Sequence, residues 1–362
     1  MKQLTFIDLF AGIGGMRLGH EQAGMKCVGY CEFDKFAIKS YRAIHDTEGE
    51  WYGEDITKAR GEEMPHADVW SFGFPCQDIS VAGKQRGLDG ERSGLFYEVM
   101  RLIGEKGDDK PEWLVIENVR NLLSIDTGRG FVEVLNQMAA HGYDVRWEVL
   151  NSKDFGVPQD RKRVLIVGRL RGRSRCEVLP ESKNGGLSYS KNDANKGRPQ
   201  AAVCSTIDTG VANRADGTFI TRRVNQVAQL IDTDSFGGNP QRGRVYGDVV
   251  SPTLTSMQGG GLEPKVICAV RPVLTPDRIN KRQNGRRYGV AIIDGYEVVI
   301  RRLTPRECWR LQGMDDERFN KAQAAGLSDR QLYKQAGNAV TVTVAKAIGE
   351  AVMSEADNNE DY

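Results

Sequence analysis

The chain has 362 residues and a formal net charge of +1, with 40% hydrophobic and 27% charged residues. This composition excludes a predominantly disordered protein, and the length predicts about two domains. No run approaches the ~18 consecutive apolar residues of a membrane span, and the first residues, MKQLTFIDLF, lack the basic and cleavable parts of a signal peptide. We therefore expect a cytoplasmic protein with no membrane partner.

Cysteine and histidine usage gives no sign of a disulfide framework or a zinc site. The seven cysteines are scattered and form no CxxC pair, and there are four histidines. We expect no metal.

The near-zero net charge argues against a protein that coats nucleic acid, because such binding depends on neutralising phosphates. The total hides a strong regional imbalance. Residues 153–175 hold eight basic and two acidic residues, and 271–310 hold ten and four. Residues 46–63 hold seven acids and two bases, and 350–362 hold five acids and no base. A local basic face is therefore compatible with the total.

Strands and helices are predicted to alternate over the first 170 residues. Helical spacing places six apolar residues between 95 and 103 on one face. The predicted strands are the apolar runs at 4–10, 26–31, 69–74, 113–117 and 164–168. This alternation predicts a mostly parallel sheet with helices on both faces.

The texture changes near residue 180 to Gly, Asn, Ser, Thr and Arg, which predicts a second, loop-rich domain. Short strands are expected at 217–221, 249–255, 265–270 and 289–300. Helical texture returns at 303–313. Residues 339–353 begin with a strand-like VTVTV, but the spacing of their apolar residues favours a helix.

A glycine turn follows the first predicted strand, in Phe10-Ala-Gly12-Ile13-Gly-Gly15. Glycines let backbone amides approach a ligand closely, and a helix N-terminus favours an anionic group. The turn departs from the GxGxxG dinucleotide pattern, so a plain strand-to-helix turn is the alternative.

Acidic and aromatic residues end the second predicted strand, at Glu32-Phe33-Asp34. An acid here commonly binds ribose hydroxyls, and an aromatic neighbour can stack on a base. The alternative for Asp34 is a cap on the next helix, and both readings can hold because different residues are involved.

Cys76 and Glu117 follow the third and fourth long strands, where reactive groups of open α/β sheets lie. Cys76 is a candidate nucleophile, with a buried inert cysteine as the alternative. Apolar surroundings would favour the protonated form of Glu117, which could then donate as well as accept a proton. Its alternative is a cap on the following segment.

Five short motifs, in order, give the sequence its family resemblance: FAGIGG, GFPCQ, ENV, QDRKR and QAGNAV. Together they resemble the DNA (cytosine-5) methyltransferase family over nearly the whole chain. The resemblance implies a Rossmann-like α/β S-adenosylmethionine-dependent domain, formed by residues 1–180 and 303–362. Residues 181–302 lie where that family carries a smaller, loop- and β-rich target recognition domain.

The resemblance also implies a set of cofactor-binding residues. The glycine turn would hold the methionine carboxylate, Glu32 the ribose, and Phe33 and Asp55 the adenine. The GEDI segment that contains Asp55 has one residue more than the family's GDI. The full set is Phe10, Gly12, Ile13, Gly15, Glu32, Phe33, Asp55, Ile56, Pro75, Leu95, Asn338 and Val340.

The expected chemistry is methylation of cytosine carbon 5. Cys76 would add to carbon 6, Glu117 would assist at ring nitrogen 3, and Arg161 and Arg163 would supply positive charge. The target must leave the duplex to be reached. The expected DNA-contacting residues are Gln77, Ser80, Lys84, Thr253, Leu254 and Thr255. We expect a monomer that acts on double-stranded DNA, in a restriction-modification system or in phage self-protection, without physical association with any cognate endonuclease.

Three other functions are weighed against this one. An NAD-dependent oxidoreductase would explain the glycine turn and the strand-end acid, but not PCQ, ENV or QDRKR. An RNA cytosine methyltransferase would have a smaller recognition region. A catalytically silent DNA-binding protein has no use for Cys76 together with Glu117.

Overall fold

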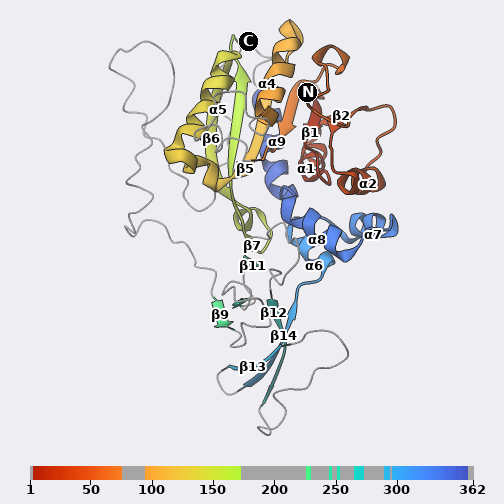
Figure 1. Cartoon of the computed structure of the whole chain (residues 1–362), viewed down its shortest axis with the longest axis vertical. Coiled ribbons are helices and arrows are strands. Elements are labelled where there is room, and N and C mark those ends of the chain that lie inside the picture. Colours follow the sequence, from red (N-terminus) through yellow and green to blue (C-terminus); the bar gives the residue numbers. More distant parts are fainter. Residues whose placement is uncertain are drawn as a thin grey trace.

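The computed structural model describes residues 3–75, 94–172 and 303–357, together with the backbone of short strands between 226 and 302. Its centre is a seven-stranded sheet of order β3-β2-β1-β4-β5-β8-β6 (Figure 1). The strands are β1 (Thr5–Leu9), β2 (Lys26–Cys31), β3 (Trp51–Gly53), β4 (Val69–Phe72), β5 (Trp113–Val119), β6 (Tyr143–Asn151) and β8 (Lys162–Leu170).

The sheet is mostly parallel, and its strand order is that of a doubly wound fold. The pairs β3–β2, β2–β1, β1–β4 and β4–β5 are parallel, whereas β8 runs antiparallel to both β5 and β6. The strand order reverses between β1 and β4, and ligands of such sheets bind beside the carboxyl ends of the strands at that point.

The predicted Rossmann-like α/β class is confirmed, and so are the five strands expected in the first 170 residues. Two strands of the sheet, β3 and β6, were missed.

Helices cover both faces of the sheet, as expected. The α-helices of the described residues are α1 (Gly15–Gln22), α2 (Lys35–Ile44), α4 (Gly94–Glu105), α5 (Arg129–Ala140), α6 (Pro305–Leu311), α7 (Asp316–Ala324), α8 (Asp329–Asn338) and α9 (Val342–Asp357). Side chains of α4 and α5 share one buried cluster with the sheet, and those of α1 and α9 share another on the opposite face. The helix expected at 339–353 is therefore confirmed as α9.

Alternating strand residues separate the two clusters. Ile7 and Leu9 of β1 point toward α4 and α5, whereas Phe6 points toward α1 and α9. The last helix of the chain thus completes a core that the first strand begins.

A third cluster joins α6, α7 and α8 to the start of α1. Each of these three helices begins at a capped residue. Thr304 and Ser328 form capping boxes with Glu307 and Gln331, and Asp315 accepts the Arg318 amide.

A smaller five-stranded sheet lies between 226 and 302, in the order β13-β14-β12-β10-β9. The strands are β9 (Gln226–Gln229), β10 (Arg244–Tyr246), β12 (Lys265–Pro272), β13 (Gly289–Ile293) and β14 (Tyr296–Arg302). The run expected as one strand at 289–300 is thus a hairpin, while the strand expected at 217–221 lies outside the described residues.

Two further short strands form a separate two-stranded sheet. β7 (Gln159–Asp160) pairs in parallel with β11 (Ser251–Pro252), and Figure 1 shows the pair between the large sheet and the small one. In the portions that the structure describes, no helix has the length and apolarity to cross a membrane.

Candidate cofactor and catalytic site

The described residues of the predicted site gather at the carboxyl edge of the parallel strands. The glycine turn follows β1, Glu32 follows β2, Asp55 follows β3, Pro75 follows β4, and Glu117 lies near the end of β5. The predicted positions are thus brought to one edge of the sheet, beside its switch point.

The glycine turn is held in backbone conformations that side chains rarely adopt. Gly12 and Gly14 have φ angles of 59° and 79°, and Phe10 itself has a φ of 53°. A Cβ on Gly15 would lie 2.3 Å from the carbonyl oxygen of Val340. Only glycine lets these two predicted cofactor positions, from opposite ends of the chain, come together.

Glu32 uses both carboxylate oxygens on the backbone around it. Oε2 accepts the Gly12 amide at 2.8 Å, and Oε1 accepts the Asp34 amide at 2.7 Å. Glu32 therefore ties the glycine turn to the end of β2. Phe33, which lies between Glu32 and Asp34 in the sequence, is 73% exposed. An aromatic ring so exposed at a strand end is available for stacking on a flat ligand.

Asp34 caps α2, as the alternative reading of the sequence predicted. Its side chain accepts the amides of Phe36 and Ala37, and its second oxygen accepts a hydrogen bond from Lys334 Nζ at 2.6 Å. Desolvation opposes ionisation, but Lys334 and the capping amides outweigh it and lower the pKa of Asp34. The C-terminal motif is thereby joined to the loop that presents Phe33.

Asp55 is engaged with its own turn. Oδ1 accepts from the Thr57 hydroxyl at 2.7 Å and from the Thr57 amide at 3.0 Å, and Lys58 lies 3.3 Å from Oδ2. The hydrogen bond from the Thr57 hydroxyl is the main cause of the lowered pKa of Asp55. The carboxylate is thus fixed as an anionic acceptor at the end of β3.

The remaining cofactor candidates differ in exposure. Ile56 is buried, Ile13 is buried in the cluster around α6 to α8, and Pro75 and Asn338 are exposed. Leu95 packs on the core at the start of α4.

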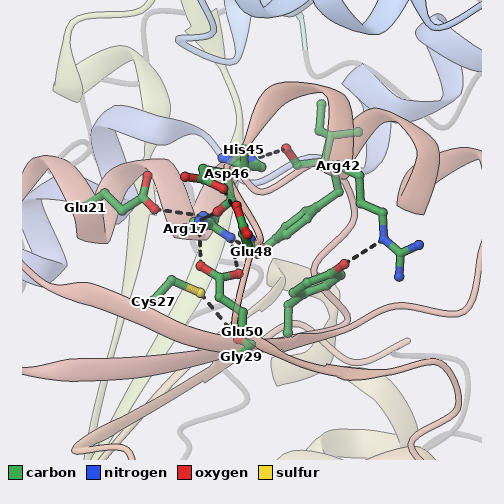
Figure 2. A network of polar contacts seen from close by, with 12 residues as sticks. Arg17, Glu21, Cys27, Gly29, Arg42, His45, Asp46, Glu48 and Glu50 are labelled. Atoms are coloured by element: carbon green, nitrogen blue, oxygen red, sulfur yellow. Dashed lines mark hydrogen bonds and ion pairs between the residues drawn. The ribbon is translucent and has the colours of Figure 1, made fainter.

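Figure 2 shows a network of polar contacts around Arg17, in the helix that follows the glycine turn. Arg17 donates to both Glu50 oxygens, at 2.7 and 2.8 Å, and to the Asp46 carbonyl at 2.7 Å. His45 Nε2 lies 3.2 Å from the Ile13 carbonyl oxygen. Because burial lowers the pKa of His45 to about 3, the ring is neutral and donates this hydrogen bond. The sequence carried no signal for this role of His45.

Glu117 is paired with Arg163. Arg163 Nε lies 3.0 Å from Glu117 Oε1, and both side chains are largely buried. Glu117 thus ends an apolar strand, as expected, but it also has a cationic partner, because β8 runs antiparallel beside β5 and places Val119 opposite Arg163. The alternative role as a cap is not seen, since the turn η3 (Arg120–Leu123) has no side-chain cap.

Arg161 is buried and serves the backbone of the C-terminal motif. Its guanidinium donates to the Gly337 carbonyl at 3.2 Å and to the Ala339 carbonyl at 2.9 Å. Burial, reinforced by nearby Arg163, lowers the pKa of Arg161 to about 9. This geometry positions the segment that carries Asn338 and Val340, and a direct catalytic role for Arg161 remains a prediction.

Asn118 is a site residue that the sequence displayed, within ENV, without revealing its role. Its buried Nδ2 donates to the Phe74 carbonyl at 2.9 Å, two residues before Cys76. The end of β5 thus fixes the exit of the chain from β4.

Seven predicted site residues lie outside the described residues: Cys76, Gln77, Ser80, Lys84, Thr253, Leu254 and Thr255. Across the described segments, no cluster of three His, Cys, Asp or Glu side chains could hold a metal ion.

Solved structures share this fold along the whole chain. The Entamoeba histolytica methyltransferase EhMeth superposes with a TM-score of 0.62 at 18% identity, covering 98% of this chain and 99% of that chain. The S. pombe Dnmt2 methyltransferase gives 0.59 at 16% identity, covering 99% of each. The fold is therefore shared with these two methyltransferases.

Sequence comparison defines the family. The model of the C-5 cytosine-specific DNA methylase family matches residues 4–354. The orphan methyltransferase M.SPBetaI of Bacillus phage SPbeta is 32% identical, over 99% of this chain and 100% of the relative. The type II methyltransferase M1.ScrFI of Lactococcus lactis subsp. cremoris is 34% identical, over 96% and 77%. The chain belongs to the C-5 cytosine-specific DNA methylases and is a DNA cytosine-5-methyltransferase.

Proposed function

We propose that this enzyme methylates cytosine in duplex DNA through a covalent adduct with Cys76, assisted by Glu117. The observation that carries the proposal is the Glu117–Arg163 pair, with 3.0 Å between Oε1 and Nε, at the end of β5. Asn118, the neighbour of Glu117, holds the Phe74 carbonyl, so the same strand end governs the segment that leads to Cys76.

The residues at the sheet edge fit S-adenosylmethionine. Exposed Phe33 would stack on adenine, the remaining acceptor capacity of the Glu32 carboxylate would serve the ribose hydroxyls, and the glycine turn with its helix N-terminus would hold the methionine carboxylate. Asn338 and Val340 would close the opposite side. When bound, this cofactor supplies an electrophilic methyl group.

The chain's own residues would act on cytosine in order. The Cys76 thiolate forms a bond to carbon 6, while Glu117, oriented by Arg163, donates a hydrogen bond or proton at ring nitrogen 3. The electron pair released onto carbon 5 would form the bond to the methyl group, while the methyl–sulfur bond of the sulfonium breaks and its electron pair stays on sulfur, leaving S-adenosylhomocysteine. Loss of the carbon 5 proton to a water-derived base then expels the Cys76 thiolate and restores the ring.

Access to the ring requires the cytosine to leave the helix stack. We propose residues 1–180 and 303–362 as the catalytic domain and 181–302 as the target recognition domain. Contacts with DNA are assigned to Gln77, Ser80 and Lys84, and to the Thr253-Leu254-Thr255 segment. The last follows β11 directly.

The cellular role we propose is modification of DNA, in a restriction-modification system or as phage self-protection. Relatives named as type II and as orphan phage methyltransferases support these two settings. The protein would act as a monomer in the cytoplasm, and any cognate endonuclease would share its site without binding to it.

Transfer of labelled methyl from S-adenosylmethionine to duplex DNA and to tRNA tests the proposal. We expect label on DNA, loss of at least about a thousandfold in rate for Cys76→Ser, and little change for Cys176→Ser, a cysteine outside the motifs. Label on tRNA alone would contradict the DNA assignment. Equal transfer by Cys76→Ser would contradict the covalent mechanism.

A further inference from the structure

Four buried polar side chains form a row that is linked by hydrogen bonds. Gln312 Nε2 donates to Gln159 Oε1 at 3.2 Å, and Thr341 Oγ1 donates to Gln312 Oε1 at 2.9 Å. Ser152 Oγ lies 2.8 Å from Thr341 Oγ1. All four side chains are at most 3% exposed. Buried amides and hydroxyls need hydrogen-bond partners, so each member restricts where the next can lie.

One end of this row lies on β7, the strand that pairs with β11. Gln159 belongs to β7, and β7 pairs in parallel with β11, with Ser251 opposite Gln159. Residues 253–255, assigned above to DNA contact, continue the chain from β11.

The other end lies under the cofactor segment. The Ser152 amide donates to the Arg161 carbonyl at 3.0 Å, and the Arg161 guanidinium holds the carbonyls of Gly337 and Ala339. Thr341 itself follows Val340 directly. A continuous set of buried contacts therefore runs from β7, which pairs with β11, to residues 337–340, where two of the proposed cofactor-binding residues lie.

Gln312 occupies the middle position. Its amide donates to Gln159 and accepts from Thr341, and its main-chain carbonyl accepts the Val342 amide at 2.9 Å at the start of α9. A side chain with one donor and one acceptor at this reach completes both bonds, whereas methionine has no N–H donor and no carbonyl oxygen and therefore breaks the row.

We propose that Gln312 is a positioning residue that couples DNA recognition to cofactor binding. Through it, β11 and residues 337–340 keep one relative register, so that each ligand binds more tightly when the other is present. Such coupling is reciprocal between two sites. The proposal rests on the proposed assignment of DNA and cofactor to these two segments.

The test measures the dissociation constant of S-adenosylhomocysteine, with and without long PCR-amplified duplex DNA, on the full chain. We expect DNA to tighten binding at least about fivefold in the wild type and less than about twofold in Gln312→Met. Gln323→Met, at an exposed position of α7, should keep the wild-type ratio. The ratio is informative because a merely structural loss weakens both measurements and leaves it unchanged.

Full coupling in Gln312→Met, or no coupling in the wild type, would overturn the proposal. If Gln312→Met does not fold, Thr341→Val removes the neighbouring bond with little change of shape, and the same ratio is expected to fall. The assay involves no methyl transfer, so its outcome is separate from that of the labelling experiment.

Discussion

Glu32 acts first on the protein itself, because its carboxylate accepts one amide from the glycine turn and one from the residue after Phe33. A carboxylate can accept both hydrogen bonds at once, whereas an amide must turn a donor toward one of the two N–H groups. The position of the glycine turn relative to Phe33 therefore depends on the charge state and type of this one side chain.

Glu32→Gln should raise the KM for S-adenosylmethionine at least about tenfold, the factor that corresponds to about 1.4 kcal/mol for a partly buried amide left without its partner. The kcat should change less than about threefold, since the reacting groups are untouched. Glu54→Gln, at an exposed position nearby, is the matched control. Equal effects of the two substitutions on KM would contradict the role of Glu32.

Two buried histidines predict how stability depends on pH. Burial lowers the pKa of His20 to about 4 and that of His45 to about 3, against about 6.5 in an unfolded chain. Below about pH 6.5 the unfolded chain therefore binds protons that the folded protein does not. Each histidine should lower the free energy of unfolding by up to about 1.4 kcal/mol per pH unit as the pH falls toward its folded value.

Denaturant unfolding between about pH 6.5 and pH 4.5 measures this slope. His20→Gln should make the slope shallower, while Gln323→Met, which changes an exposed side chain without a charge, should leave it unchanged. A slope that is identical in the wild type and in His20→Gln would contradict the assignment.

The packing of α1 against α9 depends on glycine. A Cβ on Gly19 would lie 2.4 Å from the Ala345 Cβ and 2.5 Å from the Lys346 amide nitrogen. The two helices can approach this closely only because α1 has no side chain at that point. The contact is what seats α9 on the sheet face that β1 and α1 begin.

Gly19→Ala should destabilise the protein by about 1–3 kcal/mol, because the added methyl group forces the helices apart. Gly104→Ala provides the control within a helix. Its Cβ would meet nothing closer than 4.0 Å, so the better helix propensity of alanine should leave stability unchanged or raise it by about 1 kcal/mol. Thermal unfolding of the two variants decides, and equal shifts in Tm would show that close packing at Gly19 is unimportant.

Some elements could be predicted from the sequence and others could not, for physical reasons. The central strands are continuous apolar runs because both faces are covered. β6 lies at the edge of the sheet, and its DVRWEVL alternates polar and apolar residues, a pattern that is typical of a strand with one covered face. β3 has three residues, too few for any pattern. The reversed direction of β8 agrees with the short connection from β6, which cannot hold a crossover.

The candidate site divides in the same way. The ends of parallel strands meet at one edge, so strand order alone predicted that Glu32 and Glu117 lie there. Arg163, which was expected from the family resemblance, reaches the same edge from antiparallel β8. The partners of Gln159 and Gln312 could not be foreseen, since they lie 153 residues apart and meet only after the C-terminal helices dock. Arg161, although flagged, turned out to hold carbonyls of the last motif.

At the scale of the whole molecule, charge is distributed by region. The net charge of +1 conceals basic stretches at 153–175 and 271–310. The first includes Arg163 beside Glu117, and strand β14 belongs to the second. The first stretch adjoins the candidate site and the second lies mostly in the proposed target recognition domain, so we expect the exposed cations of both to lie near phosphates.

DNA binding should therefore weaken steeply with salt in spite of the near-neutral total. Between about 50 mM and 200 mM salt, the affinity for duplex DNA should fall at least about tenfold, because cations displaced from phosphates are released on binding. Fluorescence anisotropy with a labelled duplex measures the slope. An affinity that does not change with salt would contradict a basic DNA-facing surface.

The position of α9 has a consequence for how the protein is made. Its residues, 342–357, cover the face of the sheet opposite α4 and α5, while the strands of that sheet are complete by Leu170. At ribosomal speeds of about 5–20 residues per second, the sheet waits about ten seconds or longer for its last helix. Until then its apolar face is uncovered on the nascent chain, and the glycine turn has no Val340 beside it. We therefore expect a chain that ends before α9 to lack methylating activity.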